Sequence, residues 1–324
     1  MSVERIIIFK LMKKKNILIT GAAGYLGSII ATKLVNLGHI VTAVDIIKYD
    51  KNSLSHLFYF DNFKFLKEDV TEEKVVKKIV KNQDFIIPLA ALVGAPLCEK
   101  FKKNTLKTNV GSIEILLKFI KKNQKIIYPT TNSGYGVGEK NKFCDETSPL
   151  RPVSLYGTTK VKAEELIFKR GNSICFRLAT VFGYSYRMRT DLLVNNFVER
   201  AIKTKKLEIF EPNFRRNYIH VKDIVDAFVF AIDNFEKLKN NIYNLGLSSA
   251  NITKIQLAKK IKKYTKDLEI NIIKNRKDPD KRDYFVSNKK IEKHGFKAKV
   301  TLDSGIKELI KIFNYCDIKF KNNY

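Results

Sequence analysis

The chain has few cysteines and histidines, and neither kind gathers in one place. Its 324 residues include four of each. The cysteines, at positions 98, 144, 175 and 316, are widely spaced and form no C-x-x-C pair. Structural zinc sites and the disulfide frameworks of small secreted proteins need close groups of such residues. The sequence therefore predicts neither of these, predicts no metal site, and favours a reduced, cytoplasmic protein.

Long apolar runs are missing as well. A helix needs about 20 consecutive apolar residues to span a bilayer, and no run in this chain approaches that length. Near the amino end, the short apolar patch at 6–9 comes before the basic residues at 13–15. A signal peptide has its charge before a longer apolar stretch. We therefore interpret residues 1–13 as an N-terminal tail and expect no membrane association.

Acidic residues are scarce relative to basic ones. The chain has 33 Asp and Glu against 61 Lys and Arg, which gives a formal net charge of +28. One interpretation is a nucleic-acid-binding protein. However, the lysines follow expected helix faces, as in "KVVKKIVK", and do not form one block. A polyanionic small substrate fits the charge equally well, so we expect no specific nucleic-acid partner.

Apolar runs and helical patterns alternate over the first half of the chain. Strands alternating with helices pair in parallel through right-handed crossovers. The sequence thus predicts an α/β fold with a Rossmann-type doubly wound parallel sheet. The expected strands are 16–20, 40–45, 63–70, 84–91, 125–131 and one within 173–183.

The alternation loosens after about residue 180. Short strands there mix with helices, and 44% hydrophobic content along the whole chain provides a sizeable core. We predict a Rossmann domain over residues 14–180. Residues 181–324 are expected to form mainly a smaller, mixed α/β C-terminal lobe for the substrate.

Three glycines lie between the first expected strand and its helix. Gly21 permits a tight turn, Gly24 lets a pyrophosphate approach the backbone, and Gly27 lets the helix pack on the strand. The helix N-terminus then offers N–H groups and a positive dipole to phosphate. Asp45 ends the second strand and can accept hydrogen bonds from ribose hydroxyls. An acidic residue at this position favours NAD over NADP. A role for Asp45 as a simple turn cap remains open, and the nearby Lys48 leaves NADP open.

Tyr156 and Lys160 are four residues apart in "YGTTK", on an expected helix over 154–170. At that spacing both side chains lie on one helix face. A phenol has a pKa of about 10, and a neighbouring ammonium brings that pKa toward the neutral range. An exposed, inert Tyr and Lys would give the same pattern. The preceding glycine turn and strands favour a catalytic pair.

These motifs resemble those of one family. "GAAGYLG", "LAA" at 89–91, "TNSGYG", "YGTTK" and "RRNYIHVKD" occur in this order within about residues 14–312. They resemble the extended short-chain dehydrogenase/reductases, the NAD-dependent epimerase/dehydratases of nucleotide sugars. The resemblance implies a homodimer formed through helices 104–122 and 154–170.

The resemblance also implies a Ser/Thr–Tyr–Lys catalytic set. The Ser/Thr of the family stands four residues before the Tyr of a closing "YG" pair. Tyr135 is that Tyr, so Thr131 matches. The Thr131 hydroxyl would bond the sugar O4, Tyr156 would take its proton, and hydride would pass from C4 to the nicotinamide. Lys160 would also bind the ribose hydroxyls.

Further residues are assigned to the cofactor by the same resemblance. They belong to the glycine turn, the ends of several strands, one helix and the catalytic pair. The residues implied to contact NAD are Gly21, Ala23, Gly24, Tyr25, Leu26, Gly27, Asp45, Ile46, Asp69, Val70, Leu89, Ala90, Ala91, Asn109, Tyr156, Lys160 and Ala179.

The substrate side is implied by three later segments. "RLATVFGYSYRMRTDLLVNNF" resembles a loop that lines the sugar nucleotide, while "FRRNYIHVKD" and "DKRDYFVSNKKI" resemble segments whose arginines hold the diphosphate. A planar guanidinium suits phosphate, although a lone arginine is more often a solvated charge. The residues so assigned are Val93, Gly94, Thr131, Asn132, Ser133, Thr180, Arg187, Arg189, Asn195, Asn196, Arg216 and Arg282. We expect His220 to be a packing or backbone-bonding residue and not a base.

The two residues after Thr131 limit the reactions that the site could catalyse. Dehydratases of the family have Asp and Glu where this chain has Asn132 and Ser133, and decarboxylases have Glu at the second position. Neither Asn nor Ser does acid–base work near pH 7. What remains is oxidation at C4, either net or transient, as in a 4-epimerase. The residues of the motifs are most similar to those of family members that oxidise GDP-D-glycero-α-D-manno-heptose for bacterial capsules. These members keep their NAD(H) tightly bound. A non-catalytic Rossmann regulator or nucleic-acid binder is a remote alternative.

Overall fold

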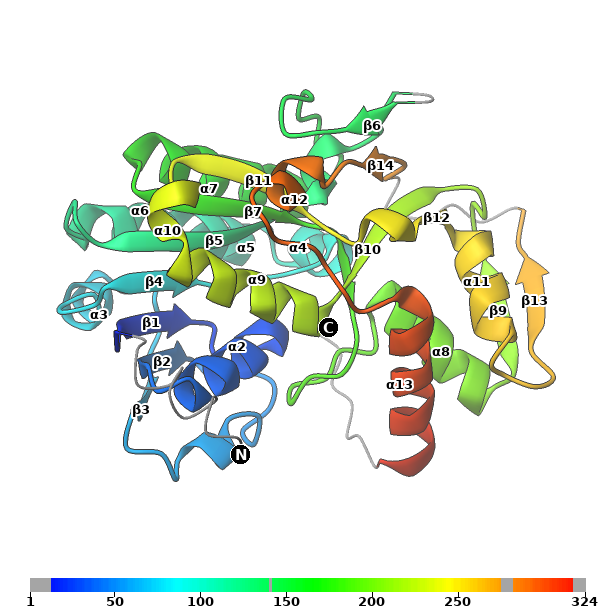
Figure 1. The fold of residues 1–324 in the computed structure, drawn as a ribbon, viewed down its shortest axis with the longest axis horizontal. Helices are drawn as coiled ribbons and strands as arrows, with labels where there is room; N and C mark the ends of the chain where they lie inside the picture. The colour runs from blue at the N-terminus through cyan, green and yellow to red at the C-terminus, as the bar shows by residue number, and fades with distance from the viewer. Residues whose placement is uncertain (1–12, 140–141, 275–281, 317–324) are drawn as a thin grey trace.

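A computed structural model describes residues 13–139, 142–274 and 282–316 of the chain (Figure 1). Apart from Lys13, the expected N-terminal tail lies outside these residues. The largest feature is a sheet of seven strands, in which every neighbouring pair is parallel. In spatial order the strands are β11 (Asn241–Leu245), β7 (Ser173–Leu178), β5 (Lys125–Thr131), β4 (Phe85–Pro88), β1 (Asn16–Thr20), β2 (Ile40–Asp45) and β3 (Phe63–Lys67).

Helices cover both faces of this sheet, as Figure 1 shows. Helices α2 (Tyr25–Asn36) and α9 (Val221–Asp233) enclose one apolar core, and α3 (Glu73–Ile79), α6 (Ser112–Phe119) and α7 (Leu155–Arg170) enclose the other. The inner strands β4 and β7 are buried along their whole length, as parallel strands between two helix layers must be. The predicted doubly wound α/β class is therefore confirmed. The short helices α10 (Phe235–Leu238) and α12 (Lys289–Lys293) add to the first core.

A smaller lobe is built from later segments. Its sheets are β12 (Asn251–Thr253), β10 (Arg215–His220) and β8 (Thr180–Phe182); β13 (Glu269–Ile272) with β9 (Lys206–Ile209); and β14 (Phe285–Val286) with β6 (Phe143–Cys144). Helices α8 (Leu193–Lys203), α11 (Lys254–Lys262) and α13 (Leu302–Tyr315) surround a separate core. Because α9 and β11 return to the large sheet, the two lobes are interleaved in sequence. The domain boundary at residue 180 stays a prediction.

Three expected elements have a different form. The expected helix over 104–122 is broken by a π-helical turn at Lys107–Gly111, which separates α5 (Lys102–Leu106) from α6. The expected sixth strand divides at Ala179 into β7 and β8, which belong to different sheets. This division takes the chain from the first lobe into the second. The third expected strand also ends early, at Lys67.

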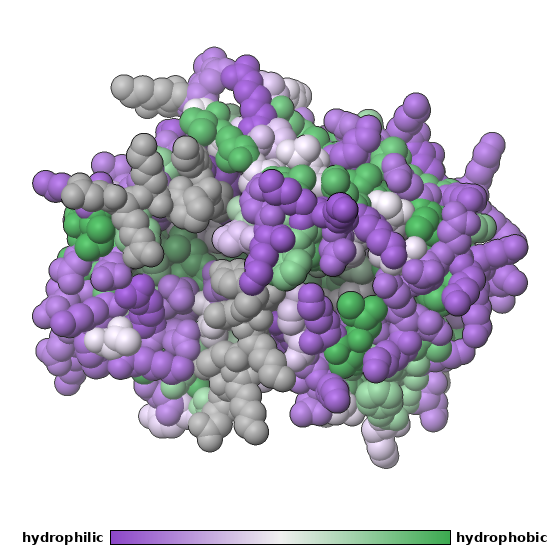
Figure 2. Space-filling view, turned by 180° about the vertical axis from the view of Figure 1, so that it is seen from behind, coloured by the Kyte–Doolittle hydropathy of each residue, from purple (hydrophilic) through white to green (hydrophobic). Residues whose placement is uncertain are grey.

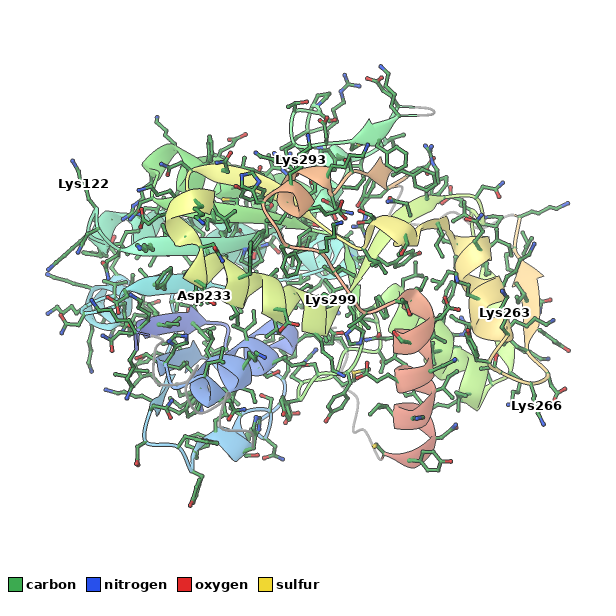
Figure 3. All side chains as sticks on the ribbon, in the orientation of Figure 1. Lys122, Asp233, Lys263, Lys266, Lys293 and Lys299 are labelled. Carbon is green, nitrogen blue, oxygen red and sulfur yellow. The ribbon has the colours of Figure 1, made fainter. Side chains whose placement is uncertain are left out.

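The positive charge is dispersed over the surface. In Figure 3 the exposed residue Lys122 lies at the left edge of the molecule, Lys293 at the top, and Lys263 and Lys266 at the right. Figure 2 shows hydrophilic side chains over most of the visible face, with apolar side chains in small separate patches. Within the described ranges, no helix is long and apolar enough to cross a membrane.

His220 joins the start of α9 to α13. Its Nδ1 accepts from the Lys222 backbone N–H (3.2 Å), so the proton lies on Nε2, which donates to Glu308 Oε2 at 2.5 Å. His220 thus bonds backbone as expected. Burial raises the pKa of Glu308, but hydrogen bonds from His220 and Lys222 outweigh burial and lower this pKa to about 2.

We predict that Glu308→Gln lowers the free energy of unfolding at pH 7 by about 1–3 kcal/mol, because it removes a charge-assisted hydrogen bond. The folded-state pKa of Glu308 lies below the unfolded value. The stabilisation is therefore complete above about pH 5 and is lost as the pH falls toward 2. Urea denaturation at pH 7 and pH 3 should show a smaller difference between variant and wild type at pH 3.

The matched control is Glu269→Gln, which removes a surface ion pair with Lys206. The side chains of Glu269 and Lys206 are 62% and 64% exposed. Its effect should stay below about 0.5 kcal/mol. A difference for Glu308→Gln that is equal at both pH values would contradict the prediction.

Candidate active site

A cavity of ≈ 760 Å³ lies at the carboxyl ends of the central strands and is lined by residues of both lobes. Its walls include Gly21 after β1 and Leu89 after β4. Strand order reverses between β1 and β4, since β2 and β3 follow on one side and β5 and β7 on the other. In open α/β sheets ligands bind at this kind of crevice.

The glycine turn brings backbones closer than side chains would allow. Gly21 has φ +68°, and a Cβ there would lie 2.6 Å from the Ala90 backbone nitrogen. A Cβ at Gly27 would lie 2.3 Å from the Gly21 carbonyl oxygen. Gly24 caps α2 without a side-chain hydrogen bond, and the first turn of α2 has no acidic residue. This helix terminus is therefore suited to a phosphate.

Asp45 at the end of β2 supports the same turn. Its carboxylate accepts from the backbone N–H of Ala23 (3.0 Å) and of Ile47 (2.7 Å). Burial raises the pKa of Asp45, and these hydrogen bonds oppose that rise. Asp45 is thus a turn cap, and it also lines the cavity. A carboxylate has about four acceptor sites, so it can accept from ribose hydroxyls as well. The glycine turn and Asp45 together fit a dinucleotide.

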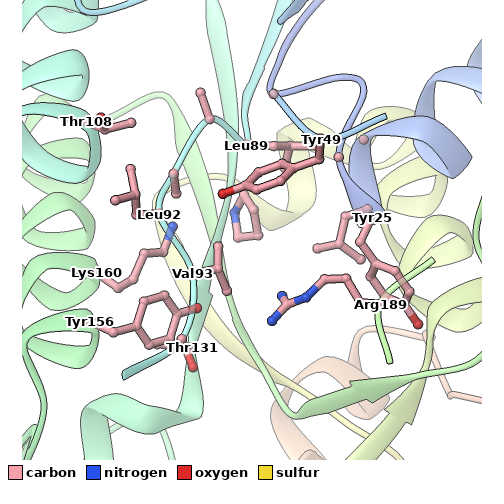
Figure 4. Close-up of a pocket in the computed structure, with 18 of the residues that line it drawn as sticks. Tyr25, Tyr49, Leu89, Leu92, Val93, Thr108, Thr131, Tyr156, Lys160 and Arg189 are labelled. Atoms are coloured by element: carbon pink, nitrogen blue, oxygen red, sulfur yellow. The ribbon is translucent and has the colours of Figure 1, made fainter. Parts of the chain in front are cut away.

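The structure brings Thr131, Tyr156 and Lys160 together on one wall. Thr131 ends β5 and caps the 3₁₀ turn Asn132–Tyr135, while the other two project from the first turns of α7, which Ser154 caps. Figure 4 shows all three side chains pointing into the cavity from the same side. The Lys160 Nζ lies 4.0 Å from the ring centroid of Tyr128, and burial lowers the pKa of Lys160 to about 7.

The electrostatics around Tyr156 involve the second lobe. Burial raises the pKa of the Tyr156 phenol. The positive charges of Arg282 and Arg189, together with a hydrogen bond from Thr131, lower it. The spacing of Tyr156 and Lys160 predicted Lys160 as the stabilising charge. The charges that lower this pKa most are instead those of the two arginines, which no local spacing indicates.

Helix α7 is fixed by a buried ion pair. Arg177 on β7 donates to Glu164 of α7, with the shortest contact at 2.6 Å. The same guanidinium donates to the Tyr135 hydroxyl (3.1 Å), which in turn donates to Asn244 Oδ1 (2.7 Å). Tyr135 of the "TNSGYG" motif therefore has a structural role.

The loop after β8 is attached to α2. The Tyr25 hydroxyl donates to the Gly183 carbonyl (2.7 Å), and the Ser185 hydroxyl donates to the Tyr25 carbonyl (2.7 Å). Ser185 Oγ also lies 3.1 Å from Ser28 Oγ. All of these groups are buried. Because of these bonds, the same helix that begins at the glycine turn also holds the loop that leads to Arg187 and Arg189.

Most of the predicted site residues line this cavity, but three do not. Asn109 bonds the backbone N–H (2.8 Å) and carbonyl (3.0 Å) of Leu92, and so holds the loop after β4. Asn195 accepts from the Gly183 N–H (3.0 Å) and donates to the Arg189 carbonyl (2.8 Å). The side chain of Asn132 is buried outside the cavity lining. The geometry thus gives Asn109 and Asn195 supporting positions instead of the expected direct contacts.

Tyr49 is a lining residue that sequence analysis missed. It lies in the loop after β2, four residues beyond Asp45, and Figure 4 shows its hydroxyl directed into the cavity. The guanidinium carbon of Arg187 lies 4.6 Å from the Tyr49 ring centroid. Arg187 also lowers the pKa of Asp45, against the larger effect of burial. Arg187 was expected to face the sugar nucleotide, but it lies beside the residues suited to the cofactor.

Two further arginines reach the cavity from the second lobe. Arg216 on β10 is buried, and its guanidinium carbon lies 5.9 Å from the Tyr284 ring centroid. Arg282 Nη1 donates a hydrogen bond to Ser133 Oγ. Arg189 pairs with Asp191, another lining residue that sequence analysis missed (Nε to Oδ1 3.0 Å). The second lobe therefore lines the cavity with several guanidinium groups.

Comparison with known proteins agrees with this geometry. Residues 17–246 match the model of a family described as the NAD dependent epimerase/dehydratase family. The chain belongs to this family. Its cofactor is NAD, as the glycine turn and Asp45 predicted.

Two curated relatives and one solved structure give the context. A trifunctional UDP-glucose 4,6-dehydratase/UDP-4-keto-6-deoxy-D-glucose 3,5-epimerase/UDP-4-keto-L-rhamnose-reductase of Arabidopsis thaliana is 29% identical over 91% of this chain and 46% of its own length. The chain thus spans about half of that relative. UDP-glucuronic acid decarboxylase 6 of the same plant is 28% identical, over 90% of this chain and 86% of that protein. The UDP-glucose 4-epimerase of Thermotoga maritima, solved with UDP-glucose, is 26% identical with TM-score 0.80, over 92% of this chain and 98% of that chain.

We predict that Gly27→Ala weakens NAD binding at least about tenfold. The new methyl group would lie 2.3 Å from the Gly21 carbonyl, so α2 must shift away from β1 and the phosphate-binding turn must open. Such overpacking also lowers the free energy of unfolding by about 1–3 kcal/mol. Calorimetric titration with NAD measures the first effect.

Gly111→Ala is the control, because its Cβ would meet no atom closer than 3.8 Å. It should leave NAD affinity unchanged. Wild-type NAD affinity in Gly27→Ala would disprove the role given to this close packing.

Proposed function

We propose that the protein is an NAD-dependent oxidoreductase that acts on C4 of a nucleotide-activated sugar. The observation that carries the proposal is the convergence of Thr131, Tyr156 and Lys160 on one wall of a cavity that also contains the dinucleotide turn. Asn132 and Ser133 stand where carboxylates would be needed for water loss or decarboxylation. The residues present therefore supply one proton acceptor and no second acid–base pair next to Thr131.

Each residue of the set has a role that follows from its chemistry. Tyr156, as the phenolate, takes the proton from the sugar O4 hydroxyl. Thr131 donates a hydrogen bond to the sugar O4, which keeps this oxygen oriented toward Tyr156. Lys160 holds ribose hydroxyls. The glycine turn and Asp45 would hold NAD, which would supply the hydride acceptor needed for oxidation of C4 to a ketone.

The substrate proposal rests on the arginine-rich wall. Arg216 and Arg282 come from segments that resemble diphosphate-binding segments, and both line the cavity. Guanidinium groups form strong, paired hydrogen bonds with phosphate oxygens. For the sugar and base we propose GDP-D-glycero-α-D-manno-heptose, oxidised for capsular polysaccharide. The support for this choice is the similarity of "PTTNSGYG" and "RMRTDLLVN" to heptose-oxidising members of the family. We further propose a cytoplasmic homodimer.

A 4-epimerase is the second candidate. The same three residues serve transient oxidation, after which hydride returns to the other face of the sugar. The similarity to the Thermotoga maritima UDP-glucose 4-epimerase favours this candidate. The two candidates differ in whether NADH and a 4-keto sugar are released or consumed within one turnover.

We predict that Tyr156→Phe lowers kcat about 10²–10⁴-fold, because it removes the proton acceptor but leaves the ring in place. Affinity for the nucleotide sugar should change little. Tyr59→Phe is the control, because that side chain is 93% exposed and outside the cavity lining, and it should retain wild-type kcat. A Tyr156→Phe protein with wild-type turnover would refute the assignment.

The reaction type is tested by absorbance near 340 nm and product mass after GDP-heptose or UDP-glucose is added to the NAD-bound protein. Net oxidation predicts NADH and a product two hydrogens lighter. Epimerisation predicts an unchanged mass and a new stereoisomer. If the protein is purified with NADH, a keto-acid acceptor restores NAD first. No change with any nucleotide sugar would reject both candidates.

We predict that Arg216→Gln weakens binding of GDP or UDP by about 1.5–3 kcal/mol, the range for a hydrogen bond to a charged group. Competition between the two diphosphates in the wild type identifies the base. Arg200→Gln is the control: Arg200 lies on α8 outside the cavity lining, and its ion pair with Glu208 is partly exposed. Equal affinity for both variants would contradict the diphosphate role.

A further inference from the structure

The aromatic ring of Tyr128 lies against the amino group of Lys160. The Lys160 Nζ is 4.0 Å from the centroid of this ring, and cation–π contacts extend to about 6 Å. Both side chains are buried. Tyr128 belongs to β5, and its ring packs in the core between the large sheet and α7. Strand β5 thus contributes Tyr128 to the surroundings of Lys160 as well as Thr131 to the cavity wall.

The carboxylates near Lys160 leave its amino group without an ion pair. Within the described ranges, no carboxylate oxygen lies within ion-pairing distance of the Lys160 Nζ. Glu164, one helix turn further along α7, acts to raise the pKa of Lys160, but its carboxylate is bonded to Arg177 at 2.6 Å. The charge of Glu164 is therefore already compensated by another cation.

Burial acts on the other titratable groups around Lys160. It raises the pKa of the Cys175 thiol on β7 and of the Tyr128 phenol well above their usual ranges, so both groups are uncharged near pH 7. It also raises the pKa of the Tyr156 phenol. Burial of Lys160 itself lowers the pKa of this amine to about 7. The neutral amine therefore competes with the ammonium near pH 7.

We propose that Tyr128 is a positioning residue whose aromatic face keeps Lys160 charged and directed into the nucleotide cavity. The face of an aromatic ring is the negative part of its quadrupole, so it attracts an ammonium and gains little from a neutral amine. Figure 4 shows the Lys160 side chain pointing into the cavity. An ammonium has three N–H donors, so contact with the ring on one side leaves donors for ribose hydroxyls on the other. The inference rests on the proposed role of Lys160 in holding those hydroxyls.

The test measures the ionisation of Lys160 directly. Protein labelled with ¹³Cε-lysine and saturated with NAD is titrated by NMR, and the Lys160 signal is identified by its loss in Lys160→Met. Exposed lysines titrate near pH 10.4, so a signal that titrates near pH 7 is separate from theirs. No nucleotide sugar is needed. Failure of the proposed substrate would therefore leave this measurement valid.

Tyr128→Leu should lower the Lys160 pKa by about one unit, a tenfold fall in the ratio of ammonium to amine, because the ring face is removed. A loss of packing alone has the opposite sign. A smaller side chain admits water, which reduces the effect of burial and raises the pKa of a lysine. An unchanged or higher pKa in Tyr128→Leu would overturn the proposal.

Tyr128→Phe is the matched control. It keeps the aromatic face and removes the hydroxyl, so the Lys160 pKa should equal that of the wild type. A fall as large as that in Tyr128→Leu would mean that the hydroxyl, and not the ring, acts on Lys160, and would refute the assignment.

Fluorinated phenylalanines at position 128 provide an independent test in which the shape of the ring is kept. Each added fluorine withdraws electron density from the ring face and weakens its attraction for a cation. The Lys160 pKa should therefore fall progressively with one, two and three fluorine atoms. A pKa that does not depend on fluorination would count against a cation–π contact, whether or not Tyr128→Leu folds.

NAD affinity links the contact to the ribose. By calorimetry at pH 7, Tyr128→Leu should bind NAD about fivefold more weakly than Tyr128→Phe, because the ammonium fraction falls from about a half to about a tenth. At pH 5 both variants carry the ammonium, so their affinities should converge. A deficit that is equal at both pH values would make Tyr128 a packing residue only. Equal affinity at pH 7 would contradict the positioning role.

Discussion

One buried ion pair holds helix α7 in place. Glu164 of α7 and Arg177 of β7 have side chains only 3% and 6% exposed, and their contact is 2.6 Å. Loss of either partner would leave a buried charge without compensation, which is strongly destabilising. Lys160 and Tyr156 lie about one and two turns earlier, respectively, on the same helix face. The pair therefore sets where both side chains meet the cavity, and the bond from Arg177 to Tyr135 adds the turn after β5 to the same rigid unit.

The cavity combines charge from two lobes with different folds. The Rossmann lobe supplies the glycine turn, the N-terminus of α2, and Tyr156 and Lys160 of α7. The second lobe supplies Arg189, Arg216 and Arg282, which lie far along the chain from the groups they face. Burial raises the pKa of Tyr156 and lowers that of Lys160, and so favours the neutral form of each. Guanidinium groups stay charged under such burial, and this makes them the reliable source of positive potential here.

The features that could be predicted from the sequence are those with a local pattern. Parallel strands, the glycine turn and the Tyr156–Lys160 pair each occupy a short segment whose spacing fixes their geometry. The contact of Arg282 with Ser133 joins segments about 150 residues apart, so no periodicity reveals it. The π-helical turn at Lys107–Gly111 has no sequence signature either, although it carries Asn109, which holds the loop after β4. Tyr49 was missed because a loop tyrosine has no distinctive spacing.

The attachment of the loop after β8 to α2 has a consequence for protein engineering. Tyr25 holds Gly183 and Ser185 through buried hydrogen bonds, and Ser28 lies against Ser185. If the loop after β8 were replaced by the loop of a relative, these hydrogen bonds with α2 would be lost. The exchangeable unit is therefore the loop together with the first turn of α2. A chimera that exchanges this loop must therefore also exchange the start of the helix that follows the glycine turn.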